Sequence, residues 1–308
     1  MNRFVAIFCI LIHTLVLSGQ RVEKKLALKI SDVRNKKSIP YSNSYSRYSE
    51  KDILNAISYL TPLLNDTNVN VRLFCLQELA QMTRTSNSKE VIHGMISFYI
   101  RAISDRNGGI SGIAINHLTG YSADDFSDAH KDSLCKRVFY SGFHKDRLIK
   151  LAGYLDLQEC RSELQAAAAD TRNLSVMWAA HLALARMGDE FEIQYCLSVA
   201  KKYGINDATV NSLVSDLVYI RQPPVFLFLI DEIQKNEKKC FPANGGGNEP
   251  ISCGYRLMEY LARYIVGFPF SVDASGDIVA IDYVSALKVS RQWLSDNRTN
   301  IQLNRNIY

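Results

Sequence analysis

Acidic residues and a histidine cluster in the segment SADDFSDAHKD, which begins at Ser122. Asp128, His130 and Asp132 have the spacing of the first three ligand positions of a calcium-binding loop. The glycine and the closing glutamate that such a loop requires do not follow them. Ser122 and Asp125 have the spacing of a capping box, which would place the acidic side chains in the first turn of a helix, where the helix dipole favours them. The spacing therefore predicts a helix start rather than a metal site.

Other residue types that do chemistry show no spacing that points to a reaction. The histidines beyond residue 20 are His93, His117, His130, His144 and His181. Their spacing matches neither a metalloprotease helix nor a Cys-x-x-Cys site, so we expect no metal. The triple glycine 245–247 has no predicted strand before it and no Lys-Ser or Lys-Thr after it, which is typical of a flexible loop rather than a phosphate cradle. The sequence predicts no catalytic residues and no cofactor.

Two cysteines indicate a disulfide. Cys240 and Cys253 bracket the segment FPANGGGNEPIS, a Pro- and Gly-rich loop between two predicted helices. A disulfide that closes a loop of about 14 residues stabilises a fold by about 3 kcal/mol in the chain-entropy model. Cysteines whose pairing the spacing leaves open are Cys75, Cys135, Cys160 and Cys196. Cys75 falls on the apolar stripe of a predicted helix, which is typical of a small core residue.

The N-terminal segment MNRFVAIFCILIHTLVLSGQ has the pattern of a signal peptide. Arg3 supplies a positive start, an apolar run follows, and Ser18 and Gly19 are small residues suited to cleavage, so we assign residues 1–20 to a signal,. The apolar run is shorter than the roughly 20 residues that span a bilayer. We therefore expect export to the periplasm or the extracellular space without membrane insertion, and so short a signal favours a bacterial source.

Composition indicates a folded protein that is not specialised for nucleic acid. Of the 308 residues, 47% are hydrophobic and 22% are charged, which is typical of a globular chain,. The net charge is +5, and basic and acidic residues are interspersed. A nucleic-acid-binding protein concentrates its basic residues on one face, so this class is excluded.

Periodicity divides the chain into a short leader, a long helical region and a tail. Residues 21–50 are rich in Lys, Ser and Tyr without a sustained period, which predicts a flexible polar leader,. Residues 51–297 have apolar residues at three- and four-residue spacings, and residues 277–297 form the last predicted helix,. PPVFLFLIDEI, which begins at Pro223, is ambiguous between strand and helix, and its prolines favour a helix. Residues 298–308 are left as a C-terminal tail.

The segment LNDTNVNVRLFCLQEL, residues 64–79, recurs along the chain. It aligns without a gap with ISDRNGGISGIAINHL, residues 103–118, and one residue out of register with ADTRNLSVMWAAHLAL, residues 169–184. Each copy has an aspartate, then an aliphatic, a small and a leucine residue four apart. We expect the aspartate to accept hydrogen bonds at a helix start, and the other three to form a buried stripe that lets neighbouring helices approach closely. One such helix pair cannot bury its own apolar face, whereas stacked copies can.

These copies resemble the HEAT-repeat family, an armadillo-type group of α-solenoids, and in particular the short HEAT-like repeats of the phycobilin-lyase type. The resemblance rests on Asp66, Val71, Arg72, Cys75 and Leu79 and on the copy DTRNLSVMWAAHLALARMG. It implies an all-α fold, a right-handed α-α superhelix of about six two-helix repeats with residues 277–297 as a capping helix. Ser111 and Met177 stand where the family has an arginine, so a ladder of Asp and Arg between repeats would be incomplete.

The resemblance implies an exported scaffold, without catalysis, that binds a protein or peptide on a concave face formed by the second helix of each pair. Candidate partner-binding residues, chosen because they lie beside the buried stripe, are Arg72, Gln77, Asn116 and Trp178. The alternative is a helical enzyme or ligand-binding domain whose site is assembled from distant segments, for example from the acidic residues around His130. A deep pocket with several titratable groups would favour that alternative.

Overall fold

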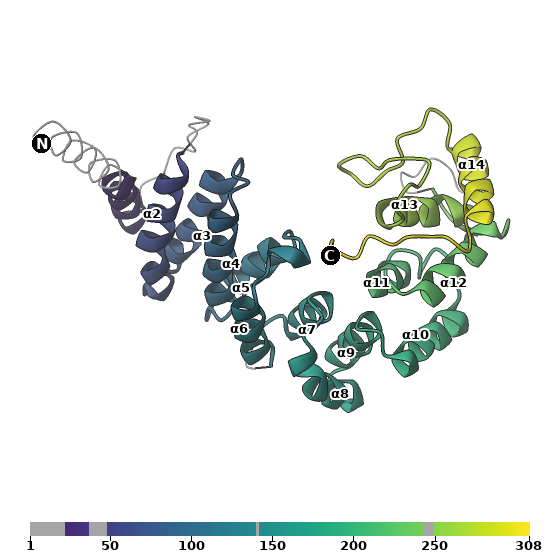
Figure 1. The fold of residues 1–308 in the computed structure, drawn as a ribbon, viewed down its shortest axis with the longest axis horizontal. Coiled ribbons are helices and arrows are strands. Elements are labelled where there is room, and N and C mark those ends of the chain that lie inside the picture. Colours follow the sequence, from purple (N-terminus) through teal and green to yellow (C-terminus); the bar gives the residue numbers. More distant parts are fainter. Residues whose placement is uncertain (1–21, 37–47, 140–141, 243–248) are drawn as a thin grey trace, which may run out of the picture. The chain divides into compact units, whose positions relative to one another are not determined.

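The computed structural model describes residues 22–36, 48–139, 142–242 and 249–308. Most of these residues are helical (Figure 1), as the all-α prediction requires. The chain divides into two compact units, residues 1–144 (unit 1) and residues 145–308 (unit 2), whereas the sequence indicated one continuous array over residues 51–297. The predicted signal, residues 1–20, lies outside the described residues.

Unit 1 is built from two rows of helices. After a helix over residues 22–34, its elements are α2 (Glu50–Leu60), η1 (Thr61–Asn65), α3 (Val69–Thr83), α4 (Lys89–Ala102), α5 (Gly108–Leu118), η2 (Ala123–Asp125) and α6 (Asp128–Val138). Helices α2, α4 and α6 are successive neighbours in one row, and α3 and α5 are neighbours in the other. Each row covers the apolar faces of the other, so the core of unit 1 lies between them.

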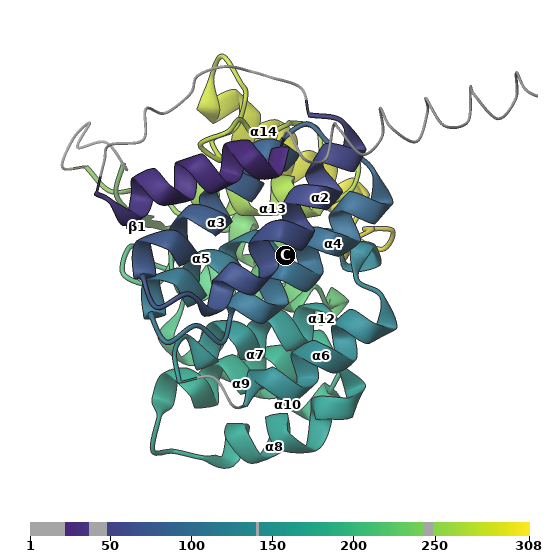
Figure 2. The ribbon, with the colours of Figure 1, turned by 90° about the vertical axis from the view of Figure 1, so that its left-hand side faces the viewer.

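The helix over residues 22–34 lies where the sequence predicted a flexible leader. Figure 2 shows this helix, in purple, lying across α3. Val22, Leu26 and Ile30 are buried, and the Lys29 ammonium pairs with the Glu78 carboxylate of α3 at 2.5 Å. The prediction of a flexible leader is wrong for these residues because three apolar side chains, four positions apart, form a stripe that the polar composition concealed.

Unit 2 has the same two-row construction. Its elements are α7 (Lys145–Tyr154), η3 (Gln158–Cys160), α8 (Arg161–Ala169), α9 (Leu174–Arg186), α10 (Glu190–Tyr203), α11 (Leu213–Ile220), α12 (Pro223–Gln234), β1 (Lys238–Cys240), β2 (Ile251–Ser252), α13 (Gly254–Tyr264) and α14 (Tyr283–Asp296). Helices α7, α9, α11 and α13 are successive neighbours in one row, and α10, α12 and α14 in the other. The ambiguous segment at Pro223 is the helix α12, with proline in its first turn,.

The stripe positions of the three sequence copies are all buried, on α3, α5 and α9. They are Val71, Cys75 and Leu79 on α3; Ile110, Ala114 and Leu118 on α5; and Val176, Ala180 and Leu184 on α9. None of them is more than 9% exposed. Burial of these positions explains why an aliphatic, a small and a leucine residue recur with four-residue spacing.

The aspartates of the three copies do not cap the helices, which corrects the role expected for them. Asn68 and Asn107 are the N-cap residues of α3 and α5, and Asn173 is that of α9. Each aspartate accepts instead from a main-chain N–H two residues on, as Asp66 does from Asn68 at 2.8 Å and Asp105 from Asn107 at 2.7 Å. The aspartate therefore shapes the turn before the helix, and the asparagine satisfies the helix N-terminus.

Helices α7 and α9 approach each other closely at Gly153. A Cβ atom at this position would lie 2.6 Å from Cα of Ala183 and 2.6 Å from the Tyr219 hydroxyl. Only glycine leaves room for that contact, which also lets the Tyr219 hydroxyl donate to the Lys150 carbonyl at 2.5 Å. The close approach positions the side chains that α7, α9 and α11 present on their shared row.

The hairpin after α12 carries the predicted disulfide. Cys240 and Cys253 are bonded with a Cα–Cα distance of 5.1 Å, and the short antiparallel pair β1 and β2 lies directly beside the bond. These strands were not expected from the sequence. Of the four cysteines whose pairing the spacing left open, Cys135 and Cys160 each take part in a disulfide, whereas Cys75 and Cys196 are free and buried. Two disulfides fit an exported protein.

Among the described residues, no helix is both long and apolar enough to cross a bilayer.

The last helix is shorter than predicted. Helix α14 begins at Tyr283 rather than near residue 277, because the side chain of Asp282 accepts from the N–H groups of Val284 and Ser285 and so caps the helix. Residues 277–282 form part of the loop that connects α13 to α14.

Candidate functional site

The C-terminal tail, residues 298–308, lies against the row formed by α7, α9, α11 and α13. Figure 1 shows it leaving the end of α14 and running past α13 and α11. Leu303 forms an antiparallel bridge with Ile265, and Asn304 N–H donates to the Tyr264 carbonyl at 2.9 Å. The sequence assigned these residues only as a C-terminal tail. Instead they form an extended peptide held on a helical surface.

The surface that holds residues 304–308 consists of Tyr154 from α7, Arg186 from α9, Tyr219 from α11, and Arg221 and Gln222 from the link to α12. We call these five residues the tail-binding surface. The helices fix the places of these side chains. Tyr154 and Arg186 are the last residues of α7 and α9, and Arg221 directly follows α11. Arg221 has a φ of 53°, a left-handed backbone conformation that ends α11 and turns the chain toward α12,.

Arg186 holds the main chain of the tail. Its Nη2 donates to the carbonyls of Arg305 and Ile307, at 3.1 and 3.2 Å. Its Nη1 donates to the carbonyl of Tyr219 in the last turn of α11, where helix carbonyls lack partners within the helix,. The guanidinium is 4.9 and 4.8 Å from the ring centres of Tyr154 and Tyr219. Arg186 thus joins α9 to α11 and presents its remaining donors to the peptide.

Arg221 makes the second set of main-chain contacts. Its Nε donates to the Asn304 carbonyl at 3.2 Å and its Nη2 to a main-chain oxygen of Tyr308, the last residue of the sequence, at 3.4 Å. Its guanidinium lies 3.3 Å from the ring centre of Tyr264, a cation–π contact at close range,. The side chain is 1% exposed, yet its Nη1 has no hydrogen-bond partner among the described residues.

Tyrosines complete the surface. The ring of Tyr308 lies 5.5 Å from that of Tyr154 and 5.7 Å from that of Tyr219, at 86° and 60°. Tyr154 donates its hydroxyl to the Asn306 carbonyl at 2.7 Å. Burial raises the pKa of Tyr308 to about 12, so this ring enters the surface as a neutral phenol. The contacts consist of main-chain hydrogen bonds together with one aromatic side chain, a form of peptide recognition.

The surface is electrostatically unbalanced. No Asp or Glu side chain among the described residues is ion-paired with Arg186 or Arg221. Burial lowers the pKa of Arg186, and burial followed by the charge of Arg186 lowers the pKa of Arg221 to about 10. Both groups stay protonated at neutral pH, so two neighbouring buried cations depend on main-chain oxygens and aromatic rings.

Trp178, one of the predicted partner-binding residues, belongs to a polar cluster on the same row. Its indole Nε1–H donates to Asp216 Oδ2 at 2.6 Å, and Lys150 Nζ pairs with Asp216 Oδ1 at 2.5 Å. Its ring is partly buried, with Tyr195 6.5 Å away. Trp178 therefore lies on the row that holds the tail, but its hydrogen-bonding group is already bound within unit 2.

The other predicted binding residues lie on unit 1, and one of them is buried. Arg72 and Asp105 are each 3% exposed and form a bidentate ion pair at 2.7 and 3.0 Å. The prediction that Arg72 binds a partner is wrong, because its guanidinium links two successive copies of the repeat. Gln77 on α3 and Asn116 on α5 are exposed at equivalent positions of the two copies.

His130, the histidine named in the enzyme alternative, is buried within unit 1. His130 is 7% exposed, and burial, followed by the charge of His93, lowers its pKa. Its Nδ1 accepts from Ser127 N–H at 3.2 Å, so the neutral ring carries its proton on Nε2 and donates to Ser97 Oγ at 2.8 Å,. A nitrogen that donates to Ser97 cannot remove its proton, and the nearby Ser122 and Asp125 form the predicted capping box.

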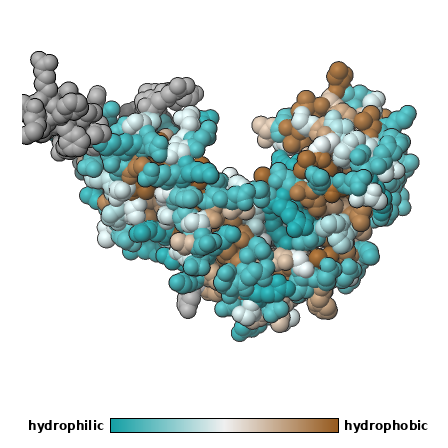
Figure 3. Space-filling model, in the orientation of Figure 1, coloured by the Kyte–Doolittle hydropathy of each residue, from teal (hydrophilic) through white to brown (hydrophobic). Residues whose placement is uncertain are grey.

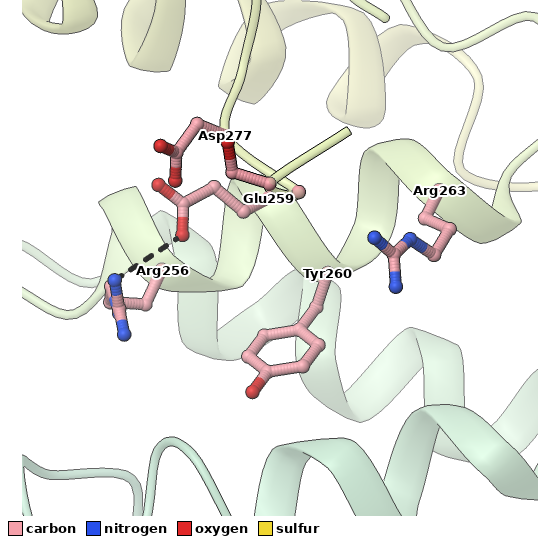
Figure 4. A pocket seen from close by; sticks show the side chains of 7 residues that line it. Arg256, Glu259, Tyr260, Arg263 and Asp277 are labelled. Atoms are coloured by element: carbon pink, nitrogen blue, oxygen red, sulfur yellow. Dashed lines mark ion pairs between the residues drawn. The ribbon is translucent and has the colours of Figure 1, made fainter. Parts of the chain in front are cut away.

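A small pocket of about 220 Å³ lies on α13 (Figure 4). It is lined by Arg256, Glu259, Tyr260, Arg263, Ser275, Gly276 and Asp277. Burial raises the pKa of Glu259, and the Arg256 guanidinium at 3.7 Å opposes that rise. Glu259 also accepts from the Tyr283 hydroxyl at 3.3 Å. Arg256 and Tyr283 favour the charged form of Glu259 but do not outweigh its burial, so its pKa stays above the ordinary value.

Sequence reasoning missed the tail-binding surface. Arg186 and Arg221 do not form a motif with each other, and their acceptors are main-chain atoms, which have no sequence signature. In the described part of the chain, no group of three His, Cys, Asp or Glu residues is arranged to hold a metal ion. No family model, no curated protein and no solved structure matches this chain.

Proposed function

We propose that this chain is an exported, non-catalytic scaffold of the HEAT-like kind that its repeated sequence resembles, and that it binds an extended peptide segment of a protein partner. The binding site is the row of α7, α9, α11 and α13 in unit 2, which would form part of the concave face of a solenoid. The observation that carries the proposal is that residues 304–308 already lie there as an extended peptide.

The nature of the contacts supports recognition of peptides. Arg186 and Arg221 donate to the main-chain carbonyls of three tail residues and to a main-chain oxygen of Tyr308. Every peptide offers such carbonyls, so these contacts bind a backbone in a defined register, and the tyrosine ring pair selects one side chain. Hydrogen bonds from charged donors contribute roughly 1.5–3 kcal/mol each when their partners are buried.

A second feature supports a partner at unit 2. Exposed apolar residues gather around the loop between α13 and α14 (Figure 3). They are Val266, Val279, Ile281, Val284 and Val289. Large exposed apolar side chains that cluster in this way often mark protein interaction sites.

The test is a screen of extended peptides against the full-length protein, with Arg186→Gln as the binding-site variant. We expect binding peptides to slow amide exchange at the ends of α9 and α11, and Arg186→Gln to weaken binding by about tenfold or more. Gln77→Ala, on the exposed face of α3, is the matched control and leaves binding unchanged. Equal binding by Arg186→Gln, or turnover of a substrate without peptide binding, would contradict the proposal.

A further inference from the structure

Another pocket, of about 510 Å³, lies in unit 1 where neighbouring helices end. Arg101 comes from the last turn of α4, Arg137 from the last turn of α6, and η1, which directly follows α2, supplies a third wall. Because α2, α4 and α6 are successive neighbours in one row, their stacking brings these three ends together. A pocket of this volume is large enough for a small organic ligand.

The two arginines of this pocket have no acidic partner. Neither Arg101 nor Arg137 forms an ion pair with any residue that the structure describes. Within the same residues, the buried Nε of Arg137 also lacks a hydrogen-bond partner. A buried donor of a charged group that lacks a partner carries a desolvation cost that no contact offsets. The pocket therefore holds positive charge without the counterion that such charge normally has.

The acidic residue that lines the pocket, Asp105, is already fully engaged. Its two carboxylate oxygens accept from the Arg72 guanidinium at 2.7 and 3.0 Å, and its Oδ1 also accepts from Asn107 N–H at 2.7 Å. The Asp105 side chain is only 3% exposed. Its charge is matched by that of Arg72, so it does not neutralise Arg101 or Arg137.

Helix dipoles do not balance the two guanidiniums either. Arg101 and Arg137 lie in the last turns of α4 and α6, where each helix carries about half a negative charge,. Two such ends offset about one of the two positive charges. Lys136, also in the last turn of α6, adds a further cation beside them. The net charge at this end of the row is therefore positive.

We propose that this pocket binds a small organic anion, with a carboxylate or phosphate group held by the guanidiniums of Arg101 and Arg137 and an apolar body against Pro62, Leu64 and Ala102. Guanidiniums suit such groups because parallel N–H donors match two oxygens in one plane. The site is separate from the tail-binding surface in unit 2, so the inference does not rest on the proposed function.

Isothermal titration of the full-length protein with four probes tests the proposal. Benzoate and phenyl phosphate carry the two head groups on an apolar ring, benzamide is the uncharged analogue of benzoate, and inorganic phosphate lacks the ring. We expect benzoate and phenyl phosphate each to bind about tenfold or more tightly than benzamide. Phenyl phosphate should bind more tightly than inorganic phosphate, because its ring adds apolar contact. The tighter of the two ring anions identifies the preferred head group.

Variants of the two arginines locate the binding. Arg101→Gln and Arg137→Gln should each weaken binding of the preferred anion by about tenfold, and Arg137→Lys, which keeps the charge without the planar fork, should weaken it less. Arg84→Gln, which removes an exposed guanidinium after α3 in the other row, is the matched control and leaves binding unchanged. The variants should keep the circular dichroism spectrum of the wild type, since neither Arg101 nor Arg137 has an ion pair to lose.

Hydrogen exchange supplies a second readout of position. The bound anion should slow amide exchange in the last turns of α4 and α6. Protection confined to α9 and α11 would place the anion on the tail-binding surface and overturn the proposal. Equal affinity for benzoate and benzamide, absence of anion binding, or equal affinity in Arg137→Gln and Arg84→Gln would also overturn it. Inorganic phosphate that binds as tightly as phenyl phosphate would overturn the organic body of the ligand.

Discussion

Arg72 and Asp105 form a bidentate ion pair in which both side chains are 3% exposed, although they come from successive copies of the repeated sequence. Arg72 also donates to the Asp66 carbonyl at 2.8 Å, so one guanidinium contacts the turns before α3 and before α5. The pair fixes how one copy stacks on the next, a role that Asp105 adds to the turn-shaping contact that Asp66, Asp105 and Asp170 share.

Removing one partner of this pair should destabilise unit 1 strongly. Arg72→Leu leaves the Asp105 carboxylate buried without its cation, which costs about 3 kcal/mol or more. Urea unfolding followed by circular dichroism measures the loss. Arg172→Leu, which removes the exposed pair with Asp170, is the matched control and should leave the midpoint unchanged,. The double variant Arg72→Leu/Asp105→Leu should recover part of the stability, and an equal or larger loss would contradict this account.

The helix over residues 22–34 offers two leucines in contrasting environments. Leu26 is 2% exposed and Leu28 is 69% exposed. Leu26→Ala should destabilise unit 1 by about 2–3 kcal/mol through lost burial, and Leu28→Ala should change stability by less than about 0.5 kcal/mol. Urea midpoints give both values, and limited proteolysis near residue 36 should become faster only in Leu26→Ala. Equal effects of the two substitutions would mean that this helix is not docked.

The disulfide between Cys240 and Cys253 should stabilise unit 2. It closes a loop with a sequence separation of 13, so the double variant Cys240→Ser/Cys253→Ser should lose about 3 kcal/mol of unfolding free energy,. Urea unfolding of the oxidised wild type and of the variant gives the difference. Alkylation of the unreduced protein should leave both cysteines unmodified, and modification of both before reduction would show that the bond does not form.

His117 should make unit 1 less stable in mild acid. Its ring stacks on Tyr99 at 4.6 Å, and burial lowers its pKa below the ordinary value of 6.5. As the pH falls below about 6.5, the unfolded chain takes up a proton before the folded chain does, so stability is complete above that pH and decreases toward the lowered pKa. His117→Phe keeps the stack and removes the titration. Its urea midpoint should therefore fall less between about pH 7.5 and 5.5 than that of the wild type.

A control for this prediction lies next to His117 on the same helix. Asn116 is exposed and does not titrate, so Asn116→Ala should keep the pH dependence of the wild type. If His117→Phe and Asn116→Ala show the same slope, His117 does not contribute to the acid sensitivity.

The sequence was sufficient for the features that depend on local pattern. Periodicity within one segment predicts the buried stripe at Val71, Cys75 and Leu79. Spacing within one segment likewise predicts the loop that Cys240 and Cys253 close. The helix over residues 22–34 was missed because its buried stripe is only three residues long, Val22, Leu26 and Ile30, in a segment rich in lysine. Whether a side chain is buried depends on residues that are distant in the sequence. Arg72 was therefore expected at the surface, although Asp105 covers its guanidinium.

The tail-binding surface could not be predicted for a related reason. Tyr154, Arg186 and Arg221 come from three segments that meet only after the helices pack, and Gly153 determines how closely two of them approach. Their partners in the tail are carbonyl groups, which every residue has. A signal was present in the arginine that directly follows the apolar end of α11, YIR, but one buried arginine does not indicate its ligand.

The central claim is that the row of α7, α9 and α11 binds an extended peptide in the register of the tail. A peptide that copies residues 301–308, with a photoreactive phenylalanine at the position of Tyr308, tests this most directly when it is cross-linked to the full-length Tyr308→Ala protein and mapped by mass spectrometry. We predict cross-links to the segments that contain Tyr154 and Tyr219, and their loss when unlabelled peptide is added in excess. Cross-links confined to unit 1 or to α14, or none at all, would contradict the account.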